Sequence, residues 1–221
     1  MPSTNPAPSP VSLPPIAAQL ERLIDLGVPG LAGVSVPDFR SLCPDSAATS
    51  DPHPLLAVHP SLVPARRLIE AVSINGRKGF LVTDMQDVDD FVPTADVAVP
   101  DDPLYLVAGL DRGDDMANWS PEEAAVEIAA RGRSPLTLNE GLSWLVQDPG
   151  ALERNHCFMT IASRKPKVTG GFDARTPALW LSNGTGRDGA AMKHHPKAGW
   201  CWWRNRHTWL GFASCAARSV V

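Results

Sequence analysis

No apolar run in the sequence approaches the roughly 18 residues that a membrane-spanning helix needs. The first 15 residues, MPSTNPAPSPVSLPP, lack both a basic segment and a continuous apolar stretch, so they do not have the pattern of a secretory signal. These absences predict a cytoplasmic protein with no membrane partner. In the cytoplasm, the four cysteines are expected to be reduced thiols and not a disulfide framework.

Several common binding motifs are also missing. The glycines do not follow the spacing of a phosphate-binding loop or a dinucleotide-binding turn, and we predict no cofactor. The usual RNP and helix-turn-helix signatures are absent, which disfavours a nucleic-acid partner. Proline, in contrast, is abundant, with 22 among 221 residues, and it predicts short helices and strands.

Charge is distributed unevenly along the chain. The net charge is −4, but residues 162–221 carry ten Lys or Arg and only two acidic residues, a local balance of +8. The first 161 residues must therefore carry −12. We expect the basic final quarter to complement the acidic part of its own chain, with an anionic partner as the alternative. The acidic stretch DMQDVDD at 84–90 lacks the spacing of a calcium loop and is expected to be solvated.

The order of the predicted elements indicates an α+β fold. Two helix starts are clear, because SPEE at 120–123 and TLNE at 137–140 both match the capping box. Strands precede and follow these helices, which favours a mostly antiparallel sheet with short helices, preceded by a small N-terminal helical hairpin. The expected parts are a disordered Pro/Ser-rich extension at 1–14, the helical hairpin at 15–44, a linker at 45–57 and the α+β domain at 58–221.

Four of the seven tryptophans lie in one stretch, GWCWWRNRHTWLG at 199–211. We predict a β-hairpin that turns at residues 204–206, because asparagine at the centre tolerates the left-handed conformation such a turn needs. Side chains alternate across a strand, so the two strands of the hairpin would present two different faces. The chemically mixed face would carry Cys201, Trp203, His207 and Trp209.

This face combines flat aromatic surfaces with positive charge. It suits an anionic or aromatic small molecule or a protein partner, and exposed indoles can equally form a homo-oligomer contact. The predicted ligand-binding residues are Trp203, Arg204, Arg206, His207 and Trp209.

Two other functions fit the same hairpin, and whether the protein is an enzyme stays open at this point. In a thiol-dependent enzyme, Cys201 would be the nucleophile and His207 its base. A zinc-stabilised module would use Cys157, Cys201, His207 and Cys215. The spacing opposes zinc, since Cys215 lies six residues beyond the partner of Cys201, or roughly 20 Å along a straight strand.

Four stretches have a distinctive pattern: RGRSPLTLNEG (131–141), NHCFMTIASR (155–164), PALWLS (177–182) and GWCWWRNRHTWLGFASC (199–215). Together they resemble an uncharacterised actinobacterial protein family, a domain of unknown function. The resemblance covers most of the chain after the proline-rich extension. It implies a bacterial cytosolic setting, and it carries no activity, cofactor or catalytic residue with it.

Overall fold

Short helices form the N-terminal part of the structure, a computed structural model that describes residues 11–43 and 51–219. The helices are α1 (Ile16–Asp25), α2 (Val28–Ala32) and α3 (Val36–Ser41), so the predicted helical hairpin has one additional helical turn between its arms. Leu13 is buried in the core, so the predicted disorder of the extension is wrong for its described end. Residues 1–10 lie outside the described residues.

A three-stranded antiparallel sheet begins inside the predicted linker. Leu55–Val58 forms β1, which pairs with β6 (Leu104–Ala108), and β6 pairs in turn with β14 (Ala217–Ser219). All four residues of β1 are buried, because the apolar run LLAV can form a strand that is covered on both faces. The linker prediction is therefore wrong from residue 55 onward, and residues 44–50 lie outside the described part of the chain.

A five-stranded sheet carries the tryptophan-rich segment. Its spatial order is β12 (Leu210–Phe212), β8 (Cys157–Met159), β10 (Arg175–Leu181), β11 (Pro196–Trp202) and β4 (Phe80–Leu81). The inner pairs are antiparallel, whereas β12 and β4 add in parallel at the two edges. The predicted hairpin is thus wrong, since β8 and β10 lie between β11 and β12 and the two segments do not pair.

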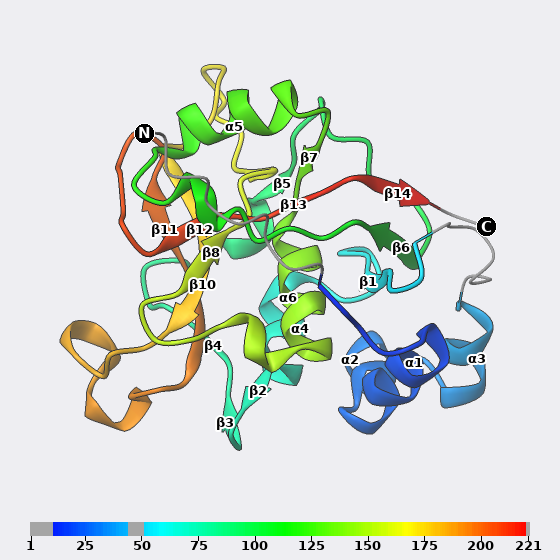
Figure 1. Cartoon of the computed structure of the whole chain (residues 1–221). Coiled ribbons are helices and arrows are strands. Elements are labelled where there is room, and N and C mark those ends of the chain that lie inside the picture. Colours follow the sequence, from blue (N-terminus) through cyan, green and yellow to red (C-terminus); the bar gives the residue numbers. More distant parts are fainter. Residues whose placement is uncertain (1–10, 44–50, 220–221) are drawn as a thin grey trace.

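Helix α6 (Leu138–Gln147) lies at the centre of the molecule, between the two sheets (Figure 1). Every residue of α6 is buried, and its start has the predicted capping box of Thr137 and Glu140. Gly141 allows the close approach to the larger sheet, because a Cβ there would lie 2.5 Å from Thr160 Cγ2 and 2.9 Å from Leu179 Cδ1. One hydrophobic core therefore joins the N-terminal helices and both sheets around α6.

Buried charge fixes the last strand to this helix. The guanidinium of Arg218, on β14, donates to both carboxylate oxygens of Glu140 at 2.6 and 2.9 Å. The hydroxyl of Tyr105 donates to the same carboxylate at 2.9 Å. Both members of the ion pair are almost fully buried, so each needs the other as its counter-charge.

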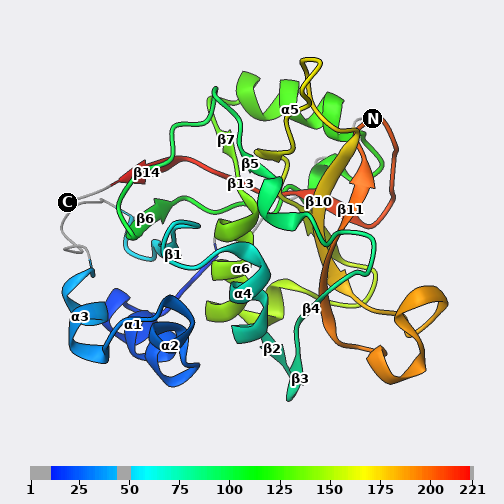
Figure 2. The same ribbon diagram turned by 180° about the vertical axis from the view of Figure 1, so that it is seen from behind.

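Helix α5 (Pro121–Ala130) covers one end of the molecule, and its predicted capping box of Ser120 and Glu123 is present. The two opposite views place the hairpin at 165–173, drawn in yellow, beside this helix (Figures 1 and 2). None of the helices in the described ranges is long and apolar enough to cross a bilayer. The remaining short elements are α4 (Ala65–Leu68), β2 (Ser73–Ile74), β3 (Arg77–Lys78), β5 (Val92–Pro93), β7 (Ser134–Pro135), β9 (Ser163–Arg164) and β13 (Ser214–Cys215).

Candidate functional site

The segment 203–209 crosses over the N-terminal end of α5 on its way from β11 to β12. The carbonyl of Trp203 accepts a hydrogen bond from the backbone N–H of Glu122 at 3.2 Å. At the surface, the Arg204 guanidinium pairs with Glu122 at 3.2 Å, and Arg206 pairs with Glu123. A hydrogen bond from the N–H of Asn205 to the oxygen of Trp202, at 3.1 Å, closes a turn directly after β11, but the chain then joins β8 as β12 and does not pair with β11. The predicted site residues Trp203, Arg204, His207 and Trp209 are divided between two pockets.

The smaller pocket has a volume of about 210 Å³ and brings together most of the predicted mixed face. Cys157, Cys201, His207 and Trp209 all line it, and Trp209 is 50% exposed. Burial raises the pKa of Cys201 to about 12 and that of Cys157 to about 11. Both thiols are therefore protonated near neutral pH, and a protonated thiol is a poor nucleophile. The geometry brings Cys201 and His207 together, but the electrostatics do not activate the thiol.

The fourth predicted zinc ligand lies elsewhere. Cys215 is buried on β13, opposite Ser134 of β7, and it is not among the residues that line the smaller pocket. Within the described ranges, no three His, Cys, Asp or Glu side chains lie close enough together to hold a metal ion. The four residues predicted for zinc therefore do not form a common site.

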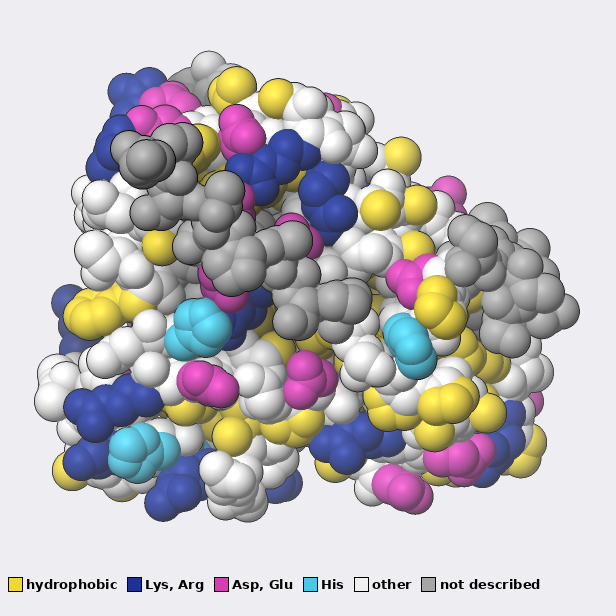
Figure 3. Space-filling view, in the orientation of Figure 1, with side chains coloured by type: hydrophobic (Ala, Val, Ile, Leu, Met, Phe, Trp, Pro, Cys, Tyr) yellow, Lys and Arg dark blue, Asp and Glu magenta, His cyan; other side chains and the backbone are white. Residues whose placement is uncertain are grey.

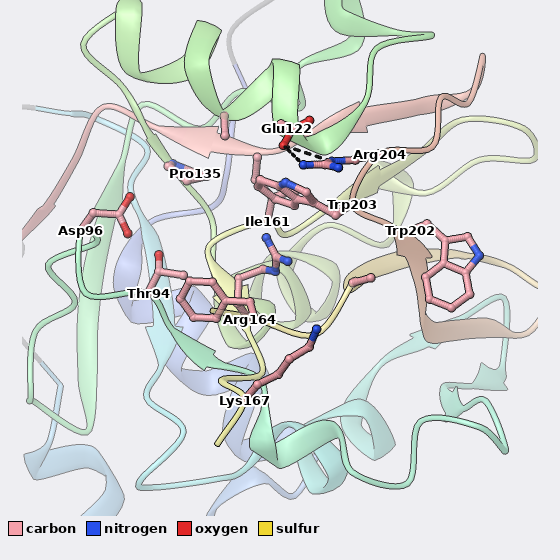
Figure 4. A pocket seen from close by; sticks show the side chains of 13 residues that line it. Thr94, Asp96, Glu122, Pro135, Ile161, Arg164, Lys167, Trp202, Trp203 and Arg204 are labelled. Atoms are coloured by element: carbon pink, nitrogen blue, oxygen red, sulfur yellow. Dashed lines mark hydrogen bonds and ion pairs between the residues drawn. The ribbon is translucent and has the colours of Figure 1, made fainter. Parts of the chain in front are cut away.

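The larger pocket has a volume of about 660 Å³ and lies between α5, the hairpin at 165–173 and the end of β11 (Figure 4). Of the predicted ligand-binding residues, Trp203 and Arg204 line this pocket, whereas Arg206 lines neither of the two. The other charged and aromatic residues that line the larger pocket are Asp96, Glu122, Arg164, Lys167, Phe172 and Trp202.

Arg164 lies at the centre of the larger pocket, below the indole of Trp203 (Figure 4). Its Cζ is 3.9 Å from the centroid of the Trp203 ring and 5.3 Å from that of Phe172. The residue is only 5% exposed, and burial lowers the pKa of its guanidinium. Nη2 donates to the backbone oxygen of Asp173 at 2.8 Å, whereas the buried Nε has no hydrogen-bond partner among residues 11–43 and 51–219.

The hairpin at 165–173 supplies one wall of the larger pocket. Its two arms are joined by hydrogen bonds from the N–H of Lys167 to the oxygen of Gly171 (2.9 Å) and from the N–H of Asp173 to the oxygen of Lys165 (2.8 Å). Gly171 has a φ of +71°, which a residue with a side chain rarely adopts. The tight turn brings Lys167 and Phe172 to the same pocket.

The distribution of ion pairs shows what is unusual about Arg164. Of the ten basic residues after position 161, seven pair with carboxylates within the described parts of the chain. This supports the expected self-complementation, and acidic and basic side chains are interspersed on the face seen in Figure 3. Arg164, Lys167 and Lys193 form no ion pair with the described residues, and the first two line the larger pocket.

Sequence reasoning missed Arg164, Lys167 and Phe172. The only sequence signal that could have pointed to them is the excess of positive charge after residue 161, because it exceeds what nearby acids can neutralise. The burial of Arg164 depends on Trp203 and Phe172, which no local pattern associates with it.

Comparison with known proteins gives a family but no activity. The model of a family of unknown function, DUF5701, matches residues 22–221. No curated protein and no solved structure matches the chain. The assignment of a role therefore rests on the geometry of the pockets.

Proposed function

The chain belongs to the family of unknown function DUF5701, and from the geometry of its site we propose that the protein binds a small molecule in the larger pocket. The ligand carries one anionic group on a flat, largely apolar body. This proposal keeps the predicted ligand class, an anionic or aromatic small molecule. It moves the site from a hairpin to the space between α5, the hairpin at 165–173 and the end of β11.

One observation carries the proposal: Arg164 is a buried cation that forms no ion pair with a carboxylate in the described parts of the chain. Removing a guanidinium from water costs several kcal/mol unless an opposite charge compensates. Its contacts with two aromatic rings and one carbonyl offset part of that cost, and no described residue accepts a hydrogen bond from its Nε. An anionic group of a ligand would supply the missing counter-charge.

The charge around Arg164 limits the ligand to about one negative charge. The pocket contains Arg164, Lys167, Arg204, Asp96 and Glu122. Because Arg204 and Glu122 neutralise each other, the remaining balance is two positive charges against one negative. A carboxylate matches that balance better than a polyphosphate does.

Aromatic side chains surround the cations and favour a flat ligand body. Trp203 covers Arg164, the ring of Phe172 lies 5.3 Å from the Arg164 Cζ, and Trp202, which is 47% exposed, also lines the pocket. The volume of about 660 Å³ lies within the range of roughly 300–1,000 Å³ that is typical of small-molecule pockets.

Three matched compounds test the proposal by isothermal titration calorimetry. These are 2-naphthoate, its neutral analogue 2-naphthamide and the more highly charged 1-naphthyl phosphate. A hydrogen bond to a charged group contributes about 1.5–3 kcal/mol, so the naphthoate should bind at least about tenfold more tightly than the amide. Naphthoate that binds no better than the amide would refute an anion site. Tighter binding of the phosphate would refute the limit on charge.

A further inference from the structure

The acidic stretch at 84–90 is largely exposed, as predicted, but Asp87 and Asp90 also form ion pairs with Lys165 at the base of the hairpin that builds the larger pocket. Oδ2 of Asp87 accepts hydrogen bonds from Lys165 Nζ at 2.7 Å and from Arg175 Nη2 at 2.6 Å. Its Oδ1 accepts from Arg175 Nη1 at 3.0 Å. The hydrogen bonds from Arg175 are the main reason that the pKa of Asp87 lies well below its ordinary value.

Asp87 joins a cation at the start of the hairpin at 165–173, Lys165, to a cation just after its end, Arg175, the first residue of β10. Lys165 begins the first arm, and Arg175 lies two residues after the second. Arg175 also pairs with the carboxylate of Asp173 at 3.1 Å, and the backbone oxygen of Asp173 accepts from Arg164. A continuous series of contacts therefore runs from Asp87 through Arg175 and Asp173 to the buried guanidinium.

We propose that Asp87 is a positioning residue for the larger pocket. Its ion pairs with Lys165 and Arg175, here called the clamp, hold the base of the hairpin, and the hairpin orients Arg164, Lys167 and Phe172. The inference rests on the proposed function, since it names what holds that binding site in shape. Asp87 does not line the pocket, so it acts on a ligand only through the hairpin. A binding group that is free to move must be ordered when the ligand arrives, and affinity falls accordingly.

The two halves of the clamp depend on Asp87 to different degrees. Lys165 has a second partner, Asp90, at 2.8 Å. Arg175 keeps its pair with Asp173, a hydrogen bond to the backbone oxygen of Asp84 at 3.2 Å and a contact with the ring of Phe91, but Asp173 belongs to the hairpin itself. Its backbone stays in β10, opposite Trp202 of β11. Without Asp87, the Arg175 guanidinium therefore has no carboxylate partner outside the hairpin among the described residues.

Asp87→Asn tests this inference, with Asp89→Asn as the matched control. Asp89 lies two residues further along the same stretch, but it pairs with Arg66, away from the hairpin. We expect D87N to weaken binding of 2-naphthoate by about three- to tenfold, the usual range for coupled neighbours. D89N should stay within about twofold of the wild type, and the conservative variant Asp87→Glu should restore most of the affinity.

Hydrogen exchange separates positioning from a general loss of stability. The amides of Lys167 and Asp173 close the hairpin, so their exchange should become faster in D87N and not in D89N, while the amides of α6 stay protected. If D87N does not fold, Lys165→Gln removes one arm of the clamp and gives the same test.

Unchanged naphthoate affinity in D87N would overturn the clamp. If the wild type does not bind naphthoate, the proposed function fails, and the clamp is judged by exchange alone. In that case, equal exchange at Lys167 and Asp173 in D87N and wild type would overturn it.

Discussion

Replacing Arg164 with methionine removes the guanidinium between Trp203 and Phe172 and leaves an apolar side chain that needs no counter-charge. The change loses a cation–π contact worth about 2 kcal/mol when desolvated. It also loses a hydrogen bond to the oxygen of Asp173, worth about 1.5 kcal/mol. Against these losses, it removes the desolvation cost of an unpaired buried cation, which amounts to several kcal/mol.

These opposing contributions nearly cancel. We therefore expect R164M to change the free energy of unfolding by less than about 1 kcal/mol, or to raise it. Arg218 provides the matched comparison, because it is equally buried but has a carboxylate partner in Glu140. R218M leaves that carboxylate buried without its cation and should lower the free energy of unfolding by about 3–5 kcal/mol.

Urea denaturation at pH 7, followed by circular dichroism, measures both changes. The free energies of unfolding of the two arginine-to-methionine variants should differ by at least about 2 kcal/mol, since only R218M breaks a buried ion pair. If R164M is as destabilised as R218M, Arg164 is a structural residue. Its lack of a carboxylate partner then says nothing about a ligand.

Three further predictions address other parts of the molecule. Burial raises the pKa of Cys201 to about 12, so Cys201 should react with iodoacetamide at pH 8 on the order of 1,000-fold more slowly than an ordinary thiol. A rate equal to that of free cysteine would instead support the hypothesis of a thiol-dependent enzyme. Gly141→Ala should lower the free energy of unfolding by about 1–3 kcal/mol in urea denaturation, because the added methyl would overlap Thr160. Unchanged stability would contradict the close packing of α6 against the sheet. The ion pairs of Asp87 lower its pKa, so the stability that they contribute is present above the ordinary aspartate pKa of 3.8 and is lost as the pH falls below that value. The amide chemical shifts of residues 165–173 should therefore stay constant from pH 7 to about 4.5, and a transition near pH 6 would argue against the clamp.

The parts of the fold that sequence reasoning predicted correctly depend on interactions within a few residues. The starts of α5 and α6 follow from the capping boxes at 120–123 and 137–140, in which each side chain bonds to a backbone group three residues away. A strand before these helices was also predicted, and β6 forms there from the short apolar run LYLVA.

The hairpin prediction failed because of contacts with a distant helix. Two tryptophan-containing segments on either side of Arg204-Asn205-Arg206 are typical of a β-hairpin, and nothing local in the sequence indicates that they pair with other strands. In the structure, Trp203 and Arg204 bind the first turn of α5 through Glu122. The chain therefore crosses over that helix and joins the far edge of the sheet as β12.

The candidate site was predictable only in part. Trp203 and Arg204 stand out in the sequence, and both line the larger pocket. Arg164 follows a buried strand and resembles any surface arginine, because its burial is set by Trp203, 39 positions further along the chain. Unpaired charge in a protein interior is a property of the whole fold, and no local pattern reports it.

If the buried guanidinium of Arg164 binds the anionic group of a ligand, the preference for a charged ligand must depend on this side chain. Calorimetric titration of wild type and R164M with both 2-naphthoate and 2-naphthamide measures that dependence, because the comparison isolates charge recognition from the fit of the naphthalene ring. We predict that the wild type prefers the naphthoate by at least about tenfold and that R164M binds both compounds equally. An R164M variant that still prefers the naphthoate would contradict the claim.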